Sequence, residues 1–238
     1  MNAIIISDLH IGSRFFSYQA FERFIKDIPD NYELVLNGDI IDNPRKKLKL
    51  PHQRALDEIK KASNRHKVIW VEGNHDKGFV PNDFGNVQFK HTHTIGNRLL
   101  IAHGHDFDDI MPKNIVFMKV FKLMHNLRIM LGAKPVHVAK YAKKWEFFYR
   151  VLRGNVMKNA IRCAIENGYE AVVCGHTHYP ENLVYNDIKY VNTGAWTEFP
   201  IYYLLITADR MSLMKVDDSF GIQTEELLIS DRSYAVHS

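Results

Sequence analysis

The sequence predicts an α/β protein whose central sheet is covered by helices and interrupted by a separate helical insert. Short β-branched runs recur along the chain and mostly end in polar residues, as the buried strands of a layered sheet do. Segments with helical spacing separate the first three runs, which is the alternation of an α/β fold. Residues 110–165 contain no such run and are strongly basic, which indicates an insert.

Eight runs are predicted to be strands: Ala3–Ser7, Glu33–Asn37, Lys67–Glu72, Arg98–His103, Glu170–Cys174, Ile188–Asn192, Ile201–Thr207 and Met211–Val216. The first predicted helix, Phe16–Lys26, places Phe21 and Phe24 on one face. The second, Pro51–Arg65, begins with a proline, which suits a helix start. Because the later runs lie closer together, we expect antiparallel pairing or a second sheet there.

Residues 110–165 are predicted to be a helical cap inserted within a single domain that spans residues 1–238. Twelve Lys and Arg accompany one acid there, Glu146, whereas the rest of the chain carries 19 basic and 26 acidic residues. Gly132 and Gly154 are expected to end helices. The three predicted cap helices are Lys113–Leu131, Pro135–Leu152 and Asn155–Asn167.

Length and composition exclude several classes of protein. With 238 residues, of which 46% are hydrophobic and 24% charged, the chain is neither disordered nor fibrous. No apolar run approaches the roughly 20 residues that span a bilayer, and the start of the chain has no basic leader. Cys163 and Cys174 are too few for a disulfide framework, which favours a reducing compartment. We therefore expect a cytoplasmic protein.

Polar clusters follow five of the predicted strands, where functional residues gather in an open α/β sheet. They are Asp8-Leu-His10, Asn37-Gly-Asp39, Gly73-Asn74-His75-Asp76, Ala102-His103-Gly104-His105 and Gly175-His176-Thr177-His178. Each cluster alone is typical of an ordinary turn. Together they hold six of the 13 histidines, each within three residues of Asp, Asn or Gly. We expect the five clusters to meet at one rim of the sheet.

The side chains in these clusters are those of a metal site. Carboxylate, amide and imidazole donors together favour Mn²⁺, Fe or Zn²⁺ over a thiolate-bound metal. Seven donors are too many for one ion, but they suit two ions about 3.5–4 Å apart with one carboxylate bridging them. The donors are Asp8, His10, Asp39, Asn74, His103, His176 and His178. The sequence therefore predicts a centre of two divalent ions, and we expect manganese, with iron or zinc as alternatives.

The order and spacing of the clusters, from residue 8 to residue 178, resemble the signature of the calcineurin-like metallophosphoesterases. The resemblance implies a four-layer α/β/β/α sandwich. The ligands that it implies for one ion are Asp8, His10 and His178. The ligands that it implies for the other ion are Asn74, His103 and His176, with Asp39 bridging the two.

The resemblance also implies three catalytic residues, Asn74, His75 and Asp76. His75 matches a histidine that contacts the substrate phosphate and protonates the leaving oxygen, and Asp76 would orient it. The two cations would supply hydroxide at neutral pH for in-line attack on phosphorus and offset charge on the phosphoryl oxygens. The implied activity is metal-dependent hydrolysis of a phosphoester or pyrophosphate.

Within that superfamily, the chain more narrowly resembles the UDP-diacylglucosamine pyrophosphohydrolases of lipid A synthesis. The helical insert and two motifs carry this resemblance, His103-Gly104-His105-Asp106 and Asn192-Thr193-Gly194-Ala195-Trp196. The chain departs from the pattern at His75, where those enzymes commonly carry Arg. The resemblance implies a nucleotide-linked glycolipid substrate. Residues 110–165 would then hold acyl chains or contact the anionic inner face of a membrane.

Three other interpretations stay open. In the first, residues 110–165 form an ordinary helical hairpin that packs on the sheet. In the second, the Lys and Arg of this segment bind nucleic acid, and the substrate is a nucleotide or nucleic acid. We favour a phosphorylated small molecule or glycolipid over nucleic acid, because no flexible basic arm accompanies the cap. A non-catalytic binding protein with the same fold is the least favoured, because such proteins usually lose metal ligands. The sequence makes no prediction of oligomeric state.

Overall fold

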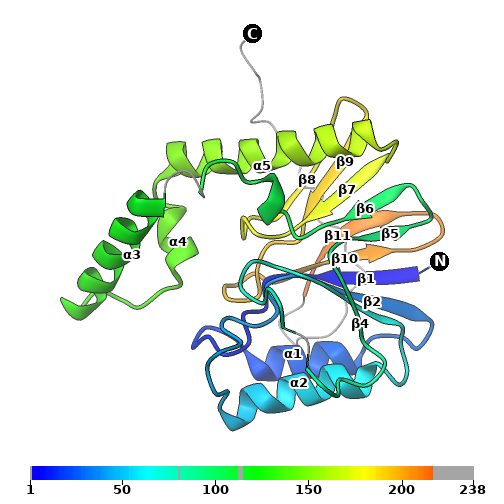
Figure 1. Cartoon of the computed structure of the whole chain (residues 1–238), viewed down its shortest axis with the longest axis horizontal. Helices are drawn as coiled ribbons and strands as arrows, with labels where there is room; N and C mark the ends of the chain where they lie inside the picture. Colours follow the sequence, from blue (N-terminus) through cyan, green and yellow to red (C-terminus); the bar gives the residue numbers. More distant parts are fainter. Residues whose placement is uncertain (1, 80, 112–114, 217–238) are drawn as a thin grey trace.

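Two β-sheets packed face to face form the body of the protein, and helices cover their outer faces (Figure 1). The computed structural model describes residues 2–79, 81–111 and 115–216. Three hydrophobic clusters fill the spaces between helix and sheet, sheet and sheet, and sheet and helix. The predicted four-layer α/β/β/α order is therefore confirmed.

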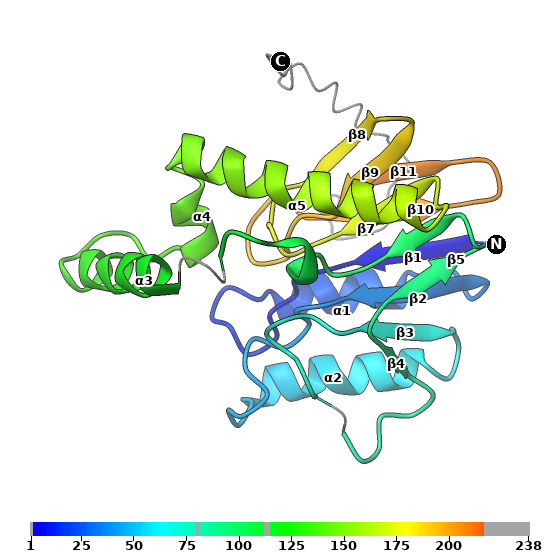
Figure 2. The ribbon, with the colours of Figure 1, turned by 45° about the horizontal axis from the view of Figure 1, so that its top comes forward.

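The first sheet has six strands in the order β11-β10-β1-β2-β3-β4. Strands β1 to β4 run parallel, and β10 and β11 extend the sheet antiparallel. The strands are β1 (Asn2–Ile6), β2 (Tyr32–Asn37), β3 (Val68–Val71), β4 (Gln88–Lys90), β10 (Tyr202–Ile206) and β11 (Met211–Lys215). Helices α1 (Tyr18–Lys26) and α2 (Leu50–Ala62) pack on its outer face (Figure 2).

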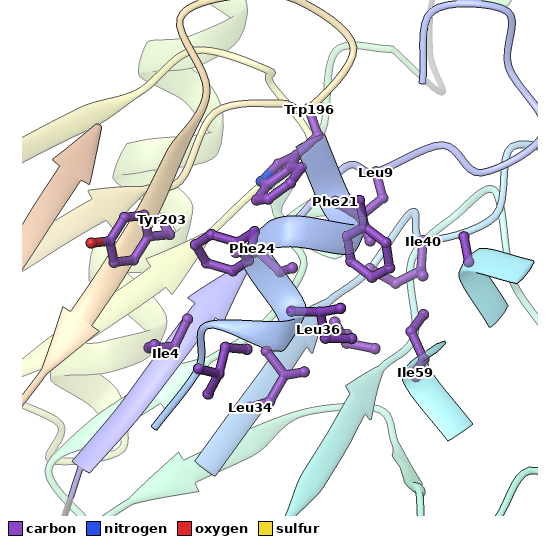
Figure 3. Packing of buried hydrophobic residues seen from close by; sticks show 14 of the residues in the cluster. Ile4, Leu9, Phe21, Phe24, Leu34, Leu36, Ile40, Ile59, Trp196 and Tyr203 are labelled. Atoms are coloured by element: carbon purple, nitrogen blue, oxygen red, sulfur yellow. The ribbon is translucent and has the colours of Figure 1, made fainter. Parts of the chain in front are cut away.

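Strand β1 shows why this sheet is buried on both faces. Its side chains alternate, so that Ile4 packs toward α1 while Ile5 packs toward the second sheet. Figure 3 shows Phe21 and Phe24 of α1 beside the outward-facing side chains of the first sheet. This explains the continuous apolar runs of the sequence, because a strand buried on both faces has no polar side.

The second sheet has five strands in the order β5-β6-β7-β9-β8, with β6, β7 and β9 parallel. The strands are β5 (His93–Ile95), β6 (Leu99–Ile101), β7 (Ala171–Cys174), β8 (Glu181–Tyr185) and β9 (Ile188–Asn192). The eight runs predicted as strands leave out β4, β5 and β8. Each of the three lies at the edge of a sheet, where one neighbour is lacking and the side chains need not all be apolar.

Helix α5 (Glu146–Glu166) corrects the prediction of two helices separated at Gly154. It runs without a break through Gly154, so the predicted helices Pro135–Leu152 and Asn155–Asn167 are wrong. Met157 and Ile161 of this helix are buried against the second sheet. Their burial outweighs the cost of about 1 kcal/mol for a glycine inside a helix.

The residues predicted as a cap divide between two parts of the molecule. The second half of α5 forms the outer helical layer of the second sheet. Helices α3 (Ile115–Met130) and α4 (Val138–Ala142) and the start of α5 project beyond the sandwich (Figures 1 and 2). The predicted start of the first cap helix, Lys113, lies outside the described residues. None of the described helices is long and apolar enough to cross a membrane.

Candidate metal centre

The structure brings the five polar clusters together at the carboxyl ends of the strands. Asp8 follows β1 and Asp39 follows β2, and their loops run side by side: the N–H of His10 donates to the carbonyl of Asp39 at 2.9 Å. Clusters of the second sheet reach the same place, since the N–H of His176, after β7, donates to the carboxylate of Asp8 at 3.1 Å. The two sheets therefore contribute to one site.

All seven predicted metal ligands lie in this site. His178 Nε2 is 3.2 Å from Asp8 Oδ1 and 3.1 Å from His10 Nε2. Asp39 Oδ2 lies between the two halves of the site, 3.9 Å from His10 Nε2 and 3.4 Å from His103 Nε2. In the second half, His176 Nδ1 is 3.0 Å from Asn74 Oδ1.

The backbone of the site is held in a conformation that residues other than glycine rarely adopt. Five of the eight such residues with positive φ among the described parts of the chain are predicted ligands, with φ between 49° and 64°. These five are Asp8, His10, Asp39, His176 and His178. A strained φ of this kind costs about 1–3 kcal/mol and persists where the surrounding structure enforces it, often at functional sites.

Glycines allow the loops to approach one another closely. A Cβ at Gly38, where φ is +78°, would lie 2.4 Å from the ring of His103. A Cβ at Gly175 would lie 2.4 Å from Asp8 Oδ2. These distances are too short for any side chain, so the glycines of the two motifs are needed for the ligands to converge.

The charges of the site are those of a cation-binding cluster. Burial raises the pKa of Asp8 and Asp39, but the neighbouring histidines outweigh it and hold both pKa values below the ordinary range. Burial lowers the pKa of His103, but Asp39 and Asp8 outweigh it and raise the pKa to about 10. A metal ion bound here must therefore displace a proton from His103.

The residues present fit divalent metal ions. His103 Nε2 is buried and has no hydrogen-bond partner in the described structure, although it faces Asp39 Oδ2. An unpartnered nitrogen beside a carboxylate is what a metal ligand presents before the ion is added. Three sets of side chains place ligand atoms within 4.8 Å of one another, and they draw on Asp8, His10, Asp39, His75, His103 and His178.

Comparison with known proteins places the chain in a family. The profile of the calcineurin-like phosphoesterases matches residues 1–180. The chain belongs to this family. Its members are phosphoesterases that bind divalent metals, which agrees with the ligand cluster described above.

Individual relatives are more distant. The DNA polymerase II small subunit of Pyrococcus furiosus is 22% identical over 92% of this chain and 43% of that protein. The small subunit of Methanothermobacter thermautotrophicus is 26% identical over 88% of this chain and 51% of that protein. The chain thus spans about half the length of these curated relatives.

Solved structures with a similar fold include Yfce, a phosphoesterase from E. coli. It is 18% identical, covers 89% of this chain and 91% of its own, and has a TM-score of 0.48. Vps29 from Entamoeba histolytica is 13% identical, covers 92% of this chain and 94% of its own, and has a TM-score of 0.49.

The second nitrogens of two ligand histidines are hydrogen-bonded to other groups, which orient the rings. His103 Nδ1 donates to the carbonyl of Asn37 at 2.8 Å, and His176 Nε2 donates to Asp108 Oδ2 at 2.9 Å. His10 Nδ1 lies 3.6 Å from Asp42 Oδ1. Such partners fix which nitrogen faces the metal. Asp108 and Asp42 thus support the phosphoesterase site, and no spacing rule of the sequence identifies them.

Asp76 does not orient His75, and the predicted role is therefore wrong. Its buried carboxylate accepts hydrogen bonds from the backbone of Ile40 and Gly73 at 2.7 Å and from Trp70 Nε1 at 3.2 Å. Burial raises its pKa, and the nearby Asp39 carboxylate adds to the increase. Asp76 holds together the two loops that carry Asp39 and Asn74. The backbone carbonyl of Asp42 is what holds His75, by accepting from its Nδ1 at 2.9 Å.

The cap also reaches the site, which sequence analysis missed. The ring of His137, at the start of α4, stacks on His178 with 5.3 Å between ring centroids and lies 5.4 Å from the ring of His10. Burial, together with the neighbouring His178 and His10, lowers the pKa of His137 to about 3. A lone histidine in a helical segment carries no sequence signal for such a position.

Three cap side chains fasten the helices to the loop that carries His176 and His178. Lys143 Nζ donates to the carbonyl of His178 at 2.7 Å, and the hydroxyl of Tyr149 donates to the carbonyl of Thr177. Arg153 donates to Glu181 Oε1 at 3.1 Å. The position of the cap is therefore coupled to two of the ligands.

Proposed function

We propose that this chain hydrolyses phosphoesters with two divalent metal ions, preferentially manganese, held at the candidate metal centre. The observation that carries the proposal is the convergence of seven metal-ligating side chains from five loops. One ion would be held by Asp8, His10 and His178. The other would be held by Asn74, His103 and His176, with Asp39 between the two.

The metal ions, when bound, supply hydroxide at neutral pH and offset charge on the phosphoryl oxygens. The residues of the chain position the substrate and move its protons. His75 is partly exposed at the edge of the site, and its Nδ1 donates to the carbonyl of Asp42. In its protonated form it therefore directs Nε2–H toward the leaving oxygen as a general acid.

Helix α3 supports a lipid-linked substrate. Five apolar side chains in α3 and just past its end recur with helical spacing and are exposed, each by 51–82%: Leu123, Met124, Leu127, Met130 and Leu131. Phe121 and His125 are buried against Tyr141 of α4, so α3 packs on the rest of the cap with a face other than the exposed one. An exposed apolar stripe in a segment rich in Lys and Arg suits acyl chains at an anionic membrane surface. We propose a nucleotide-linked glycolipid such as UDP-diacylglucosamine, hydrolysed at the inner face of a membrane.

A second candidate substrate is nucleic acid. The curated relatives are DNA polymerase small subunits, and residues 110–165 carry twelve Lys and Arg with one acid. Such a basic surface binds the phosphate backbone without needing sequence-specific contacts. Under this proposal the cap would guide a strand across the metal centre.

Metal content and turnover together test the proposal. The full chain, stripped with a chelator and reloaded with Mn²⁺, is expected to hold two ions and to hydrolyse bis(p-nitrophenyl) phosphate. Asp39→Asn is expected to lose both ions and to lower kcat/KM at least ~100-fold, because one carboxylate serves both ions. Asp57→Asn, an exposed acid on α2, is the matched control.

Substrate choice is then tested by direct comparison. UDP-diacylglucosamine and a single-stranded oligonucleotide are offered to the same manganese-loaded protein. Preferred hydrolysis of the glycolipid supports the first candidate, and cleavage of the oligonucleotide alone supports the second. Failure to bind metal or to hydrolyse any phosphoester would leave a non-catalytic protein with this fold.

A further inference from the structure

Among the cap residues that the structure describes, His137 is the one whose ring contacts two proposed metal ligands. Its ring stacks on His178 with an interplanar angle of 18°, and it also lies beside His10. The ring of Phe15 makes an edge-on contact with the ring of His137, with 5.7 Å between ring centroids. His75 approaches His10 from the core loop, with 4.7 Å between ring centroids. A phosphoryl group bound at the metals is therefore near both His75 and His137.

The hydrogen bonding of His137 determines which of its nitrogens can donate. It is the N-cap residue of α4, and its Nδ1 accepts from the N–H of Ala139 at 3.3 Å. A nitrogen that accepts carries no proton, so the proton of the neutral ring is on Nε2. Nε2 has no hydrogen-bond partner among the described residues. The fold of α4 thus prepares a neutral N–H donor beside the metal centre.

The cap contacts keep this donor in place. Lys143 lies six residues beyond His137, at the other end of α4, and it is anchored both to the carbonyl of His178 and to Glu198. Tyr149 and Arg153 fasten the next helix to the same loop. Since seven other side chains supply the two ions, His137 is not needed as a further ligand.

We propose that His137 is a phosphate-binding residue, which donates its Nε2–H to a non-bridging oxygen of the substrate phosphoryl group. The inference rests on the proposed function and assigns a part of the substrate site to the cap. Donors aimed at an oxygen where charge develops typically contribute ~10²–10³-fold in rate. No proton is transferred in this role: the hydrogen stays on Nε2, and its hydrogen bond alone offsets charge on the phosphoryl oxygen.

Two substitutions separate the donor from the helix cap. His137→Asn retains an oxygen near the position of Nδ1, so α4 stays capped while the donor is withdrawn. His137→Gln places an amide nitrogen near the position of Nε2 and keeps the donor. His52→Asn, a histidine of α2 outside the metal centre, is the control.

Metal content, binding of inorganic phosphate and turnover of bis(p-nitrophenyl) phosphate are measured for each full-length variant. We expect His137→Asn to keep both ions, to bind phosphate ~10-fold more weakly and to lose ~100-fold in kcat/KM. His137→Gln should recover most of both losses, and His52→Asn should match the unmodified protein.

Two results would overturn the assignment: phosphate binding by His137→Asn equal to that of the unmodified protein, or loss of metal in that variant, which would make the ring a ligand. If the unmodified protein binds metal and phosphate but hydrolyses nothing, the proposed function fails. The phosphate measurement still decides the role of His137 in that case.

Discussion

Single residues at this site are placed by hydrogen bonds that also hold the fold together. Asp76 is the clearest example, because three donors from different parts of the chain converge on its buried carboxylate. Its neighbour His75 is placed by Asp42 instead. The Gly-Asn-His-Asp motif therefore combines a partly exposed residue, for which we propose a catalytic role, with one that holds two loops together.

This division of roles predicts a loss of stability. Asp76→Ala leaves the N–H groups of Ile40, Gly73 and Trp70 without their buried acceptor. We expect the free energy of unfolding to fall by about 3 kcal/mol, measured by urea denaturation of the metal-free protein. Unchanged stability together with reduced activity would instead assign Asp76 a purely catalytic role. His75→Ala, at a partly exposed position, is the comparison and should change stability little.

Among the elements, α5 is distinctive because it belongs to both the sandwich and the cap. Its second half packs on the second sheet, and its first half carries Tyr149 and Arg153 to the ligand loop. One continuous helix fixes the position of the cap relative to the metal centre. Two helices separated by a break would fix it less rigidly.

Gly154 offers a test of this continuity. A Cβ at Gly154 would meet no heavy atom within 4 Å, and the residue does not have a positive φ. Gly154→Ala should therefore raise the free energy of unfolding by about 0.5–1 kcal/mol, through the helix preference for alanine. Denaturant titration measures the change. A lower stability would indicate that the helix needs a flexible point here, and Gly38→Ala provides a case where a steric clash must destabilise.

The exposed stripe of α3 predicts a surface interaction. Replacing Leu123, Leu127 and Leu131 together with Ser is expected to weaken binding to vesicles containing anionic phospholipid at least ~10-fold, because each leucine loses favourable burial in the bilayer interface. Thermal unfolding should change little, since these side chains are exposed. Leu50→Ser, an exposed leucine on α2, is the control. Equal vesicle binding by all three proteins would contradict a membrane role for α3.

At the scale of the whole molecule, the two sheets are joined by polar contacts as well as by apolar packing. Glu33 of β2 and His93 of β5 are both buried and form a hydrogen bond of 2.6 Å between the sheets. Lys67 Nζ approaches the other carboxylate oxygen of Glu33 at 3.0 Å. This cluster links the two halves that together build the metal centre.

The pH dependence of stability should report this contact. Burial raises the pKa of Glu33, but hydrogen bonds from His93 and Lys67 outweigh it and bring the pKa below its ordinary value of 4.5. A lowered native pKa means that the stabilisation is complete above pH 4.5 and is lost as the pH falls through the native value.

We therefore expect Glu33→Gln to cost about 3 kcal/mol at pH 7, with the difference from the unmodified protein shrinking below pH 4.5. Thermal unfolding at a series of pH values measures it. A difference that stays constant from pH 7 to pH 3 would show that the carboxylate charge is not involved. Glu22→Gln removes an exposed pair on α1 and should leave the melting curve unchanged.

The sequence by itself determined the layered fold, the central strands and the seven candidate metal ligands that the structure brings together. It could do so because strands buried on both faces must be apolar over their whole length, and because the candidate ligands lie within a few residues of the carboxyl ends of these strands. A ligand that closely follows such a strand, as Asp8 and Asp39 do, must lie at the carboxyl edge of the sheet, where functional residues gather. The role of the glycines beside the ligands can also be predicted from the sequence, since close approach of two backbone segments leaves no room for a side chain.

Only the tertiary structure decided which groups hold or contact the residues of the site. Asp108 holds His176, Asp42 holds His75, and the cap places His137 over the site, although all three pairs are far apart in sequence. The same is true of α5, where burial of one face overrides the helix-breaking tendency of Gly154. These outcomes depend on packing between distant segments, whose energies exceed local preferences and leave no periodic pattern in the chain.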